Sequence, residues 1–294
     1  MEQISFESMI YGDVEEINYV EIENECSIVE VLLYCPRIRP KSIDRIVELC
    51  SFYCHNEEFR HKLLNKGILK CPSMIQRLFK FGKYSIEEIE NAIFRSKKPY
   101  FYLYFKNDLK DISIFDFSNQ EEEFDVHSDE ESLSLEEYIY LSYKDNSELE
   151  KIVKYGFDPS SVEFSMKYDD EKAFERTMAG KSDECIAEWC PFEWANKPSR
   201  MDFLSFSGFF GSIRVFNLLL SSNFVLDDTV YENIICSGCM EIIHYSLSSS
   251  SIKKLLNKAC EYCHLKVMKY LIDQGGQEHY NTKDVFSFLF LSLL

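Results

Sequence analysis

Four cysteines in the last third of the chain have the residue type and spacing of a zinc site. Cys236 and Cys239 form one Cys-x2-Cys pair, and Cys260 and Cys263 form a second. Four thiolates that converge at about 2.3 Å from one ion would bind Zn²⁺ in tetrahedral geometry. The same thiols could form a switch, because the thiolate is the reactive form of cysteine. Metal binding or a thiol switch is therefore one possible function of the chain, and we keep it as the alternative to the scaffold function predicted below.

The elements that would have to position these cysteines favour a structural role. Three stretches share one pattern: a small residue, a polar one, an apolar one, a charge and two apolar residues. They cover Gly211–Leu220, Gly238–Leu247 and Cys263–Ile272. The copies therefore begin at Gly211, Gly238 and Cys263, and repetition at this spacing is typical of stacked helical hairpins. The cysteine pairs fall at nearly equivalent places in neighbouring copies, where cysteine is a common core residue, so we expect structural cysteines and no bound metal.

The chain carries no other motif for catalysis or cofactor binding. Its six histidines stand apart, and we expect the two in the repeats, His244 and His264, to be solvated. It has no His-Glu-x-x-His, no Gly-x-Ser-x-Gly and no Gly-rich phosphate loop. A net charge of −18 disfavours binding to nucleic acid phosphates. We therefore predict a protein that is not an enzyme, holds no cofactor and binds no nucleic acid.

Composition and local signals predict an all-α fold. Hydrophobic residues make up 46% of the chain, with only 10 Gly and 7 Pro, and apolar residues recur at helical spacing. We expect Gly82, Gly156 and Gly275 to end helices in the left-handed conformation. Ser85 and Glu88 have the spacing of a capping box. The predicted core positions of the repeats are Ile213, Val215, Leu218, Leu219, Met240, Ile242, Ile243, Leu265, Val267 and Leu271.

At these stretches the sequence resembles the ankyrin repeat. The third copy carries Ala259-Cys260, Cys263 in the Gly position, the apolar series from Leu265 to Ile272, and Gly275. The Thr-Pro-Leu-His turn of that repeat is absent, and the copies are closer than its usual period. Phe203–Leu219 and Tyr155–Asp170 also resemble divergent ankyrin-type proteins of unknown function that are expanded in trichomonad protists. The resemblance implies an ankyrin-like helical-hairpin solenoid that binds proteins, with no catalytic residue.

Charge divides the chain into three regions: residues 1–115 form a helical region of degenerate repeats, residues 116–134 an acidic insert, and residues 135–294 the ankyrin-like repeats. Residues 121–137 hold nine acids and no Lys or Arg, which predicts disorder. Between Phe59 and Ile86 there are seven bases and no acid. We hypothesise that the insert folds back on this basic face and competes with an acidic partner. Ser128 in the insert is a candidate phosphorylation site.

Cysteine usage and the apolar runs indicate the cellular compartment of the protein and whether it spans a membrane. Eleven cysteines and no secretory signal predict a cytoplasmic protein, with the nucleus left open. The run Val285–Leu294 would form a helix of about 15 Å, half of the roughly 30 Å of a bilayer, so we predict a cap or a truncated repeat and no membrane span. The predicted function is a non-enzymatic scaffold for a protein partner. The sequence names neither this partner nor the oligomeric state.

Overall fold

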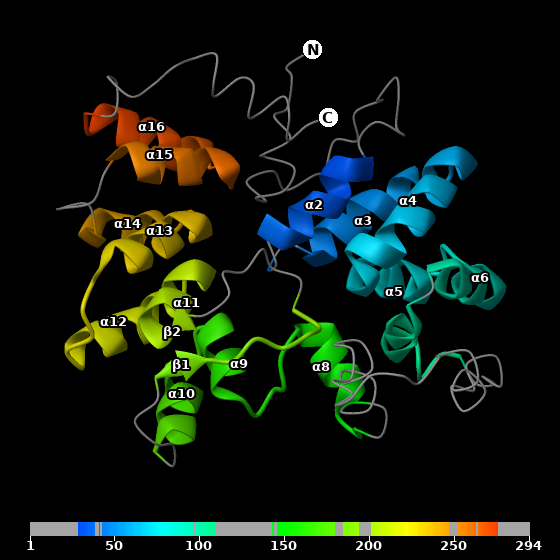
Figure 1. Cartoon of the computed structure of the whole chain (residues 1–294), viewed down its shortest axis with the longest axis horizontal. Helices are drawn as coiled ribbons and strands as arrows, with labels where there is room; N and C mark the ends of the chain where they lie inside the picture. Colours follow the sequence, from blue (N-terminus) through cyan, green and yellow to red (C-terminus); the bar gives the residue numbers. More distant parts are fainter. Residues whose placement is uncertain are drawn as a thin grey trace, which may run out of the picture. The chain divides into compact units, whose positions relative to one another are not determined.

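The computed structural model describes residues 29–38, 41, 43–96, 98–109, 143, 146–179, 185–193, 201–246, 252–262 and 264–275. These residues are mostly helical and include fourteen α-helices (Figure 1), which confirms the predicted helical character. Within them, no helix has both the length and the apolar character to cross a bilayer. The predicted insert at 116–134, Ser128 and the run at 285–294 lie outside the described residues.

The chain divides into two compact units. The first contains Met1–Pro36 and Lys41–Lys154, and the second contains Arg37–Pro40 and Tyr155–Leu294. The helices of the first unit are α2 (Val29–Ile38), α3 (Ile43–Tyr53), α4 (Glu57–Lys70), α5 (Pro72–Lys80), α6 (Ile86–Ser96), the 3-10 helix η3 (Pro99–Tyr104) and α8 (Leu149–Tyr155). Helix α5 packs against α3, α4 and η3, and α6 packs against α4 and η3.

Helix ends in the first unit follow the predicted local signals. Gly82 has a φ of 69°, so it ends α5 in the left-handed conformation that Gly adopts without a steric penalty. The capping box at the start of α6 is confirmed: Ser85 Oγ accepts from Glu88 N at 3.2 Å, and Glu88 Oε2 accepts from Ser85 N at 2.8 Å. These reciprocal bonds satisfy two amide groups that would otherwise lack a helical partner.

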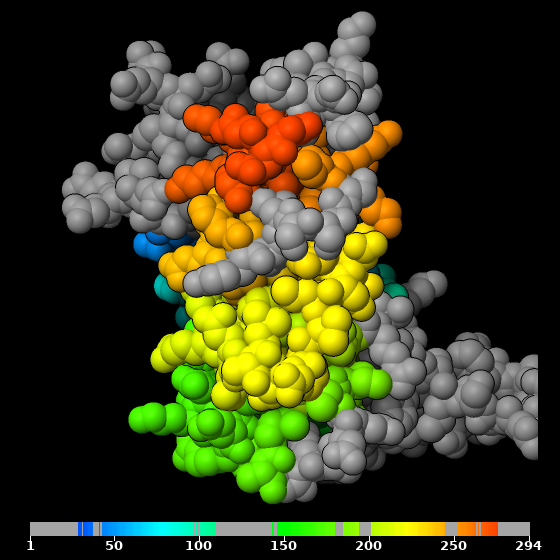
Figure 2. Space-filling model, turned by 90° about the vertical axis from the view of Figure 1, so that its left-hand side faces the viewer, coloured from blue at the N-terminus to red at the C-terminus, as the bar shows by residue number. Residues whose placement is uncertain are grey.

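The second unit is a series of helix pairs. They are α9 (Val162–Lys167) with α10 (Glu171–Met178), α11 (Phe203–Phe210) with α12 (Ile213–Ser221), α13 (Asp228–Ser237) with α14 (Met240–Ser246), and α15 (Ile252–Glu261) with α16 (Leu265–Asp273). The first helix of each pair packs against the first helix of the next, in chain order. Figure 2 shows these pairs as successive layers. A two-stranded antiparallel sheet, β1 (Ile186–Ala187) and β2 (Met201–Asp202), precedes α11.

Burial in the helix pairs confirms most of the predicted core. The buried members are Val215, Leu219, Ile242, Ile243, Val267 and Leu271. The prediction is wrong for Ile213, Leu218 and Met240, which are only partly buried. Ile213 and Met240 are the first residues of their helices, so fewer neighbouring residues cover them. Leu265 begins α16, and its side chain lies outside the described set.

Two adjacent leucines in α12 provide a test of this register. We expect Leu219→Ala to lower the free energy of unfolding by about 2 kcal/mol, because Leu219 is buried and its removal leaves a cavity. Leu218→Ala in the same helix should cost less than about 1 kcal/mol, because Leu218 already meets solvent. Urea unfolding of both variants measures the difference, and equal losses would contradict the register.

Candidate functional site

The cysteines that suggested zinc are not gathered into a ligand set in the described residues. Cys236 is buried near the end of α13, and its Sγ donates to the Glu232 carbonyl at 3.2 Å. Cys260 is buried in α15, while Cys239 is partly buried at the start of α14. Cys263 lies outside the described residues. Among those described, no three His, Cys, Asp or Glu side chains are placed to hold a metal ion.

The buried thiols of the described residues are poor nucleophiles. Burial raises the pKa of Cys236 to about 12, and it raises the pKa of Cys54 to about 11. Burial also raises the pKa of Cys50 well above its ordinary value, and neighbouring cysteines add to the effect. These thiols stay protonated at neutral pH, whereas switch chemistry needs a thiolate. They act as small apolar side chains in the packing.

The two histidines of the repeats differ from each other. His244 on α14 is exposed, as expected, and stacks on Tyr270 of α16 with ring centroids 4.7 Å apart. The prediction for His264 is wrong: it is only 4% exposed. Its Nε2 lies 2.9 Å from the carbonyl oxygen of Cys236, and therefore carries the proton that it donates. The ring fits there because Gly238 has no side chain.

The turns inside successive helix pairs are linked to one another. Asp169, between α9 and α10, has a φ of 57°. Its carboxylate accepts from Val215 N at 3.0 Å and from Arg214 Nε at 3.2 Å, both on α12. His264 makes the corresponding link from the last pair back to α13. Such bonds fix the register of one hairpin on the next, which the sequence pattern alone did not reveal.

The basic stretch of the first unit is largely neutralised. Five of its seven bases pair with carboxylates of the same unit: Arg60 with Glu88 at 2.6 Å, Lys66 and Lys70 with Glu30, Arg77 with Asp44 at 3.1 Å, and Lys80 with Glu150 at 3.1 Å. Five of the seven bases on which the insert was hypothesised to fold back are therefore already paired within the unit. The acids that pair with them are distant in sequence, so a count along the chain could not identify them.

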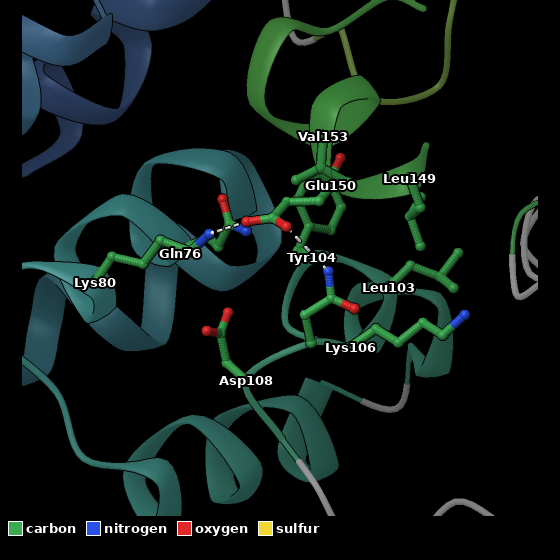
Figure 3. A pocket seen from close by; sticks show the side chains of 10 residues that line it. Gln76, Lys80, Leu103, Tyr104, Lys106, Asp108, Leu149, Glu150 and Val153 are labelled. Atoms are coloured by element: carbon green, nitrogen blue, oxygen red, sulfur yellow. Dashed lines mark hydrogen bonds and ion pairs between the residues drawn. The ribbon is translucent and has the colours of Figure 1, made fainter. Parts of the chain in front are cut away.

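A hollow in the first unit lies where α8 meets α5 and η3 (Figure 3). Its cavity volume of about 10 Å³ has room for about one water molecule, far below the roughly 300–1,000 Å³ of ligand sites. Glu150 at its edge accepts from Lys80 Nζ at 3.1 Å and from Asn107 Nδ2 at 3.3 Å, as Figure 3 shows. These bonds attach α8 to its neighbours, so the hollow is better explained as a joint between helices than as a ligand site.

These ion pairs predict an acid-sensitive first unit. Hydrogen bonds from Lys66 and Lys70 lower the pKa of Glu30 below its ordinary 4.5, and a hydrogen bond from Lys80 lowers that of Glu150. A lowered folded-state pKa adds stability that is present above pH 4.5 and lost as the pH falls through the folded-state pKa. We expect Glu30→Gln to cost about 0.5–1 kcal/mol at neutral pH, since the pair is partly screened by solvent.

Unfolding free energies between about pH 6 and pH 3 test this prediction. The loss caused by Glu30→Gln should shrink as the pH falls, because the carboxylate is then protonated in both proteins. Asp44→Asn is the control. Because the Asp44 side chain is 86% exposed, this variant should change the unfolding free energy less than Glu30→Gln does. A loss at Glu30 that stays constant over this range would contradict the electrostatic origin.

Lys167 and Glu193 form a buried ion pair in the second unit. Lys167 Nζ lies 2.5 Å from Glu193 Oε2 and donates to the Tyr155 carbonyl at 2.7 Å. The two side chains are 6% and 4% exposed. The ammonium also lies 5.6–5.7 Å from the ring centroids of Phe157, Tyr168 and Phe210, within the range of cation–π attraction. The ammonium is thus paired, hydrogen-bonded and enclosed by rings.

Glu193 belongs to residues 185–193, which we call the strap. The strap lies across α9 and α11. Glu188 N donates to Glu163 Oε1 of α9 at 3.1 Å, and the Trp189 ring lies 5.2 Å from the Phe206 ring of α11. The sequence pattern predicted no structural role for residues 185–193. Aromatic residues are frequent in the sequence before and after the strap, from Phe157 to Phe210. This pattern could have indicated that the strap packs on its neighbours.

Comparison with known proteins adds no identity to this geometry. No family model, no curated protein and no solved structure matches the chain.

Proposed function

We propose that the chain is a non-enzymatic protein-interaction scaffold, built in its second unit as an ankyrin-like stack of helical hairpins. The observation that carries the proposal is the ordered packing of α9, α11, α13 and α15, each with its own second helix. A stack of this kind has an extended surface, because each layer contacts only its neighbours. The links at Asp169 and His264 support it, since both join one layer to the next.

Surface chemistry supports a protein partner. The second helices present exposed polar side chains on successive layers, among them Asn217 on α12, Glu241 on α14 and Lys269 on α16. A surface of mixed charge suits another mixed or basic protein surface. The net charge of −18 favours such partners over nucleic acid. The proposed partner is therefore a protein whose contact surface is basic or of mixed charge.

Affinity capture from native extract with three baits tests the scaffold proposal. The wild-type chain should retain a partner at stoichiometric level, and cross-links should map to the second unit. Ile234→Asp should abolish retention, because Ile234 is fully buried in α13 and a charge there disrupts the stack. Thr229→Asp on the exposed side of the same helix is the matched control. Equal retention by all three baits, or none by the wild type, would contradict the proposal.

Elemental analysis separates this proposal from the alternative based on Cys236, Cys239, Cys260 and Cys263. We expect the purified chain to hold no stoichiometric zinc. Among the described residues no group of metal-ligating side chains is assembled, and burial raises the pKa of Cys236 to about 12. A tightly held zinc ion that disappears in Cys260→Ser would support the alternative function and contradict the scaffold proposal.

A further inference from the structure

The strap is the long connection of the stack. Residues 222–227 suffice to join α12 to α13, whereas residues 179–200 separate α10 from the strand before α11. The strap is the part of that connection which returns over the first helices. Apart from the two-residue pairing of β1 with β2, it has no regular secondary structure. The amide of Phe203, at the start of α11, donates to the Cys185 carbonyl at 2.9 Å, and side-chain anchors hold the rest of the strap on α9 and α11.

Three anchors hold the strap on this surface. Glu193 reaches the Lys167 ammonium at 2.5 Å. Trp189 packs on an aromatic floor, with its ring 5.2 Å from Phe206 and 6.0 Å from both Phe209 and Phe210. The third anchor is the bond from the backbone of Glu188 to Glu163. A tryptophan on an aromatic surface and a desolvated charge pair are the residues that dominate binding at protein interfaces.

The surface beneath the strap is shaped for these anchors. Gly156 has a φ of 81°, and a Cβ at that position would overlap the Glu193 carboxylate. The absent side chain leaves room for the carboxylate to approach the backbone closely. Lys167 is held in place by the Tyr155 carbonyl as well as by Glu193. An anionic group and a flat aromatic group, separated as in Trp-x3-Glu, fit this surface together.

We infer that the face of α9 and α11 beneath the strap is a peptide-binding site, which the strap occupies as an intrachain ligand. The partner that fits it is a peptide segment with a Trp-x3-Glu pair, which displaces the strap. This inference rests on the proposed scaffold function and names one class of partner for it. The site offers the Glu163 carboxylate as an acceptor and the Lys167 ammonium as a donor, both on α9, together with the aromatic floor of α11.

Exchange of the strap against a free peptide tests the inference. A protease site is inserted on each side of residues 185–193 in the full chain, after Ser182 and after Asn196. The probe is a fluorescent peptide of residues 184–194 with serine in place of Cys185 and Cys190. We expect the intact chain to bind the peptide weakly, because the tethered strap competes for the site at high effective concentration, and we expect the cut chain to bind it more tightly. Glu193→Ala in the peptide should weaken binding by more than about tenfold, which corresponds to about 1.4 kcal/mol.

A matched peptide provides the control. Glu188→Ala removes an exposed carboxylate but keeps the backbone N–H that bonds to Glu163, so it should bind like the unaltered peptide. Equal weakening by both substitutions would overturn the inference. A cut chain whose second unit stays helical but does not bind the peptide would also overturn it, as would one whose second unit unfolds.

The two proposals fail separately. Partner capture by the intact chain without peptide exchange would remove only the strap inference. Peptide exchange without any captured partner would remove only the wider scaffold proposal.

Discussion

Glu193→Ala is expected to lower the unfolding free energy of the second unit by about 3–5 kcal/mol. The substitution leaves the Lys167 ammonium without its carboxylate, and its side chain is only 6% exposed. Breaking one partner of a buried ion pair costs far more than the pair itself contributes, because an isolated charge must be desolvated. Urea unfolding followed by circular dichroism, with hydrogen exchange to assign the loss to the second unit, measures the effect.

Two further variants separate charge burial from general damage to the strap. Glu188→Ala removes a carboxylate of the same type from an exposed strap position and should cost less than about 0.5 kcal/mol. The double variant Lys167→Met, Glu193→Leu should be more stable than Glu193→Ala, because apolar residues of similar volume replace the pair. If the double variant lost as much unfolding free energy as Lys167→Met and Glu193→Leu lose together when made singly, the two charges would not be coupled.

The parts of the fold that depend on neighbouring residues could be predicted from the sequence. The capping box at Ser85 needs only the spacing of two side chains, and both of its bonds are present. Gly82 and Gly156 were expected in the left-handed conformation, and both have it. A helix end is decided within one turn, so it can be read from a few consecutive residues. The same holds for the helical stripe that buries Val215 and Leu219.

The parts that depend on distant residues could not be predicted. Lys167 and Glu193 belong to different elements, and either one alone reads as a surface charge. Asp169 occupies a turn where two later helix pairs have Gly211 and Gly238, and its partners Val215 and Arg214 lie on a later helix. The basic stretch has no acid of its own, yet Lys66 and Lys70 pair with Glu30, which lies far from them in the sequence. Charges therefore had to be located in three dimensions before their role could be stated.

The zinc-like spacing of the cysteines has a related explanation. Cys236 lies near the end of a first helix and Cys239 just beyond the following Gly238 turn, so the helix end separates them. Cys260 occupies the buried side of the next first helix. Cys236 and Cys260 are thus buried at corresponding places in neighbouring hairpins, as expected of packing residues. Burial raises the pKa of Cys236 to about 12, so this thiol is protonated at neutral pH.

Gly238→Ala is expected to lower the unfolding free energy of the second unit by about 3–4 kcal/mol. A left-handed φ of 68° costs a residue with a Cβ about 1–2 kcal/mol. The new methyl group would also overlap the His264 ring. Displacing that ring removes its bond to the Cys236 carbonyl and leaves a buried acceptor without a partner, which costs about 1–3 kcal/mol more. Urea unfolding measures the total.

Gly82→Ala separates the two costs. Gly82 has nearly the same φ, 69°, but nothing lies within 4 Å of a Cβ at that position. It should therefore cost only the conformational part, about 1–2 kcal/mol, measured by hydrogen exchange in the first unit. His264→Ala removes the ring, so adding Gly238→Ala to it should cost no more than Gly82→Ala does. If the full 3–4 kcal/mol persisted in that background, the link between α13 and α16 would not pass through this histidine.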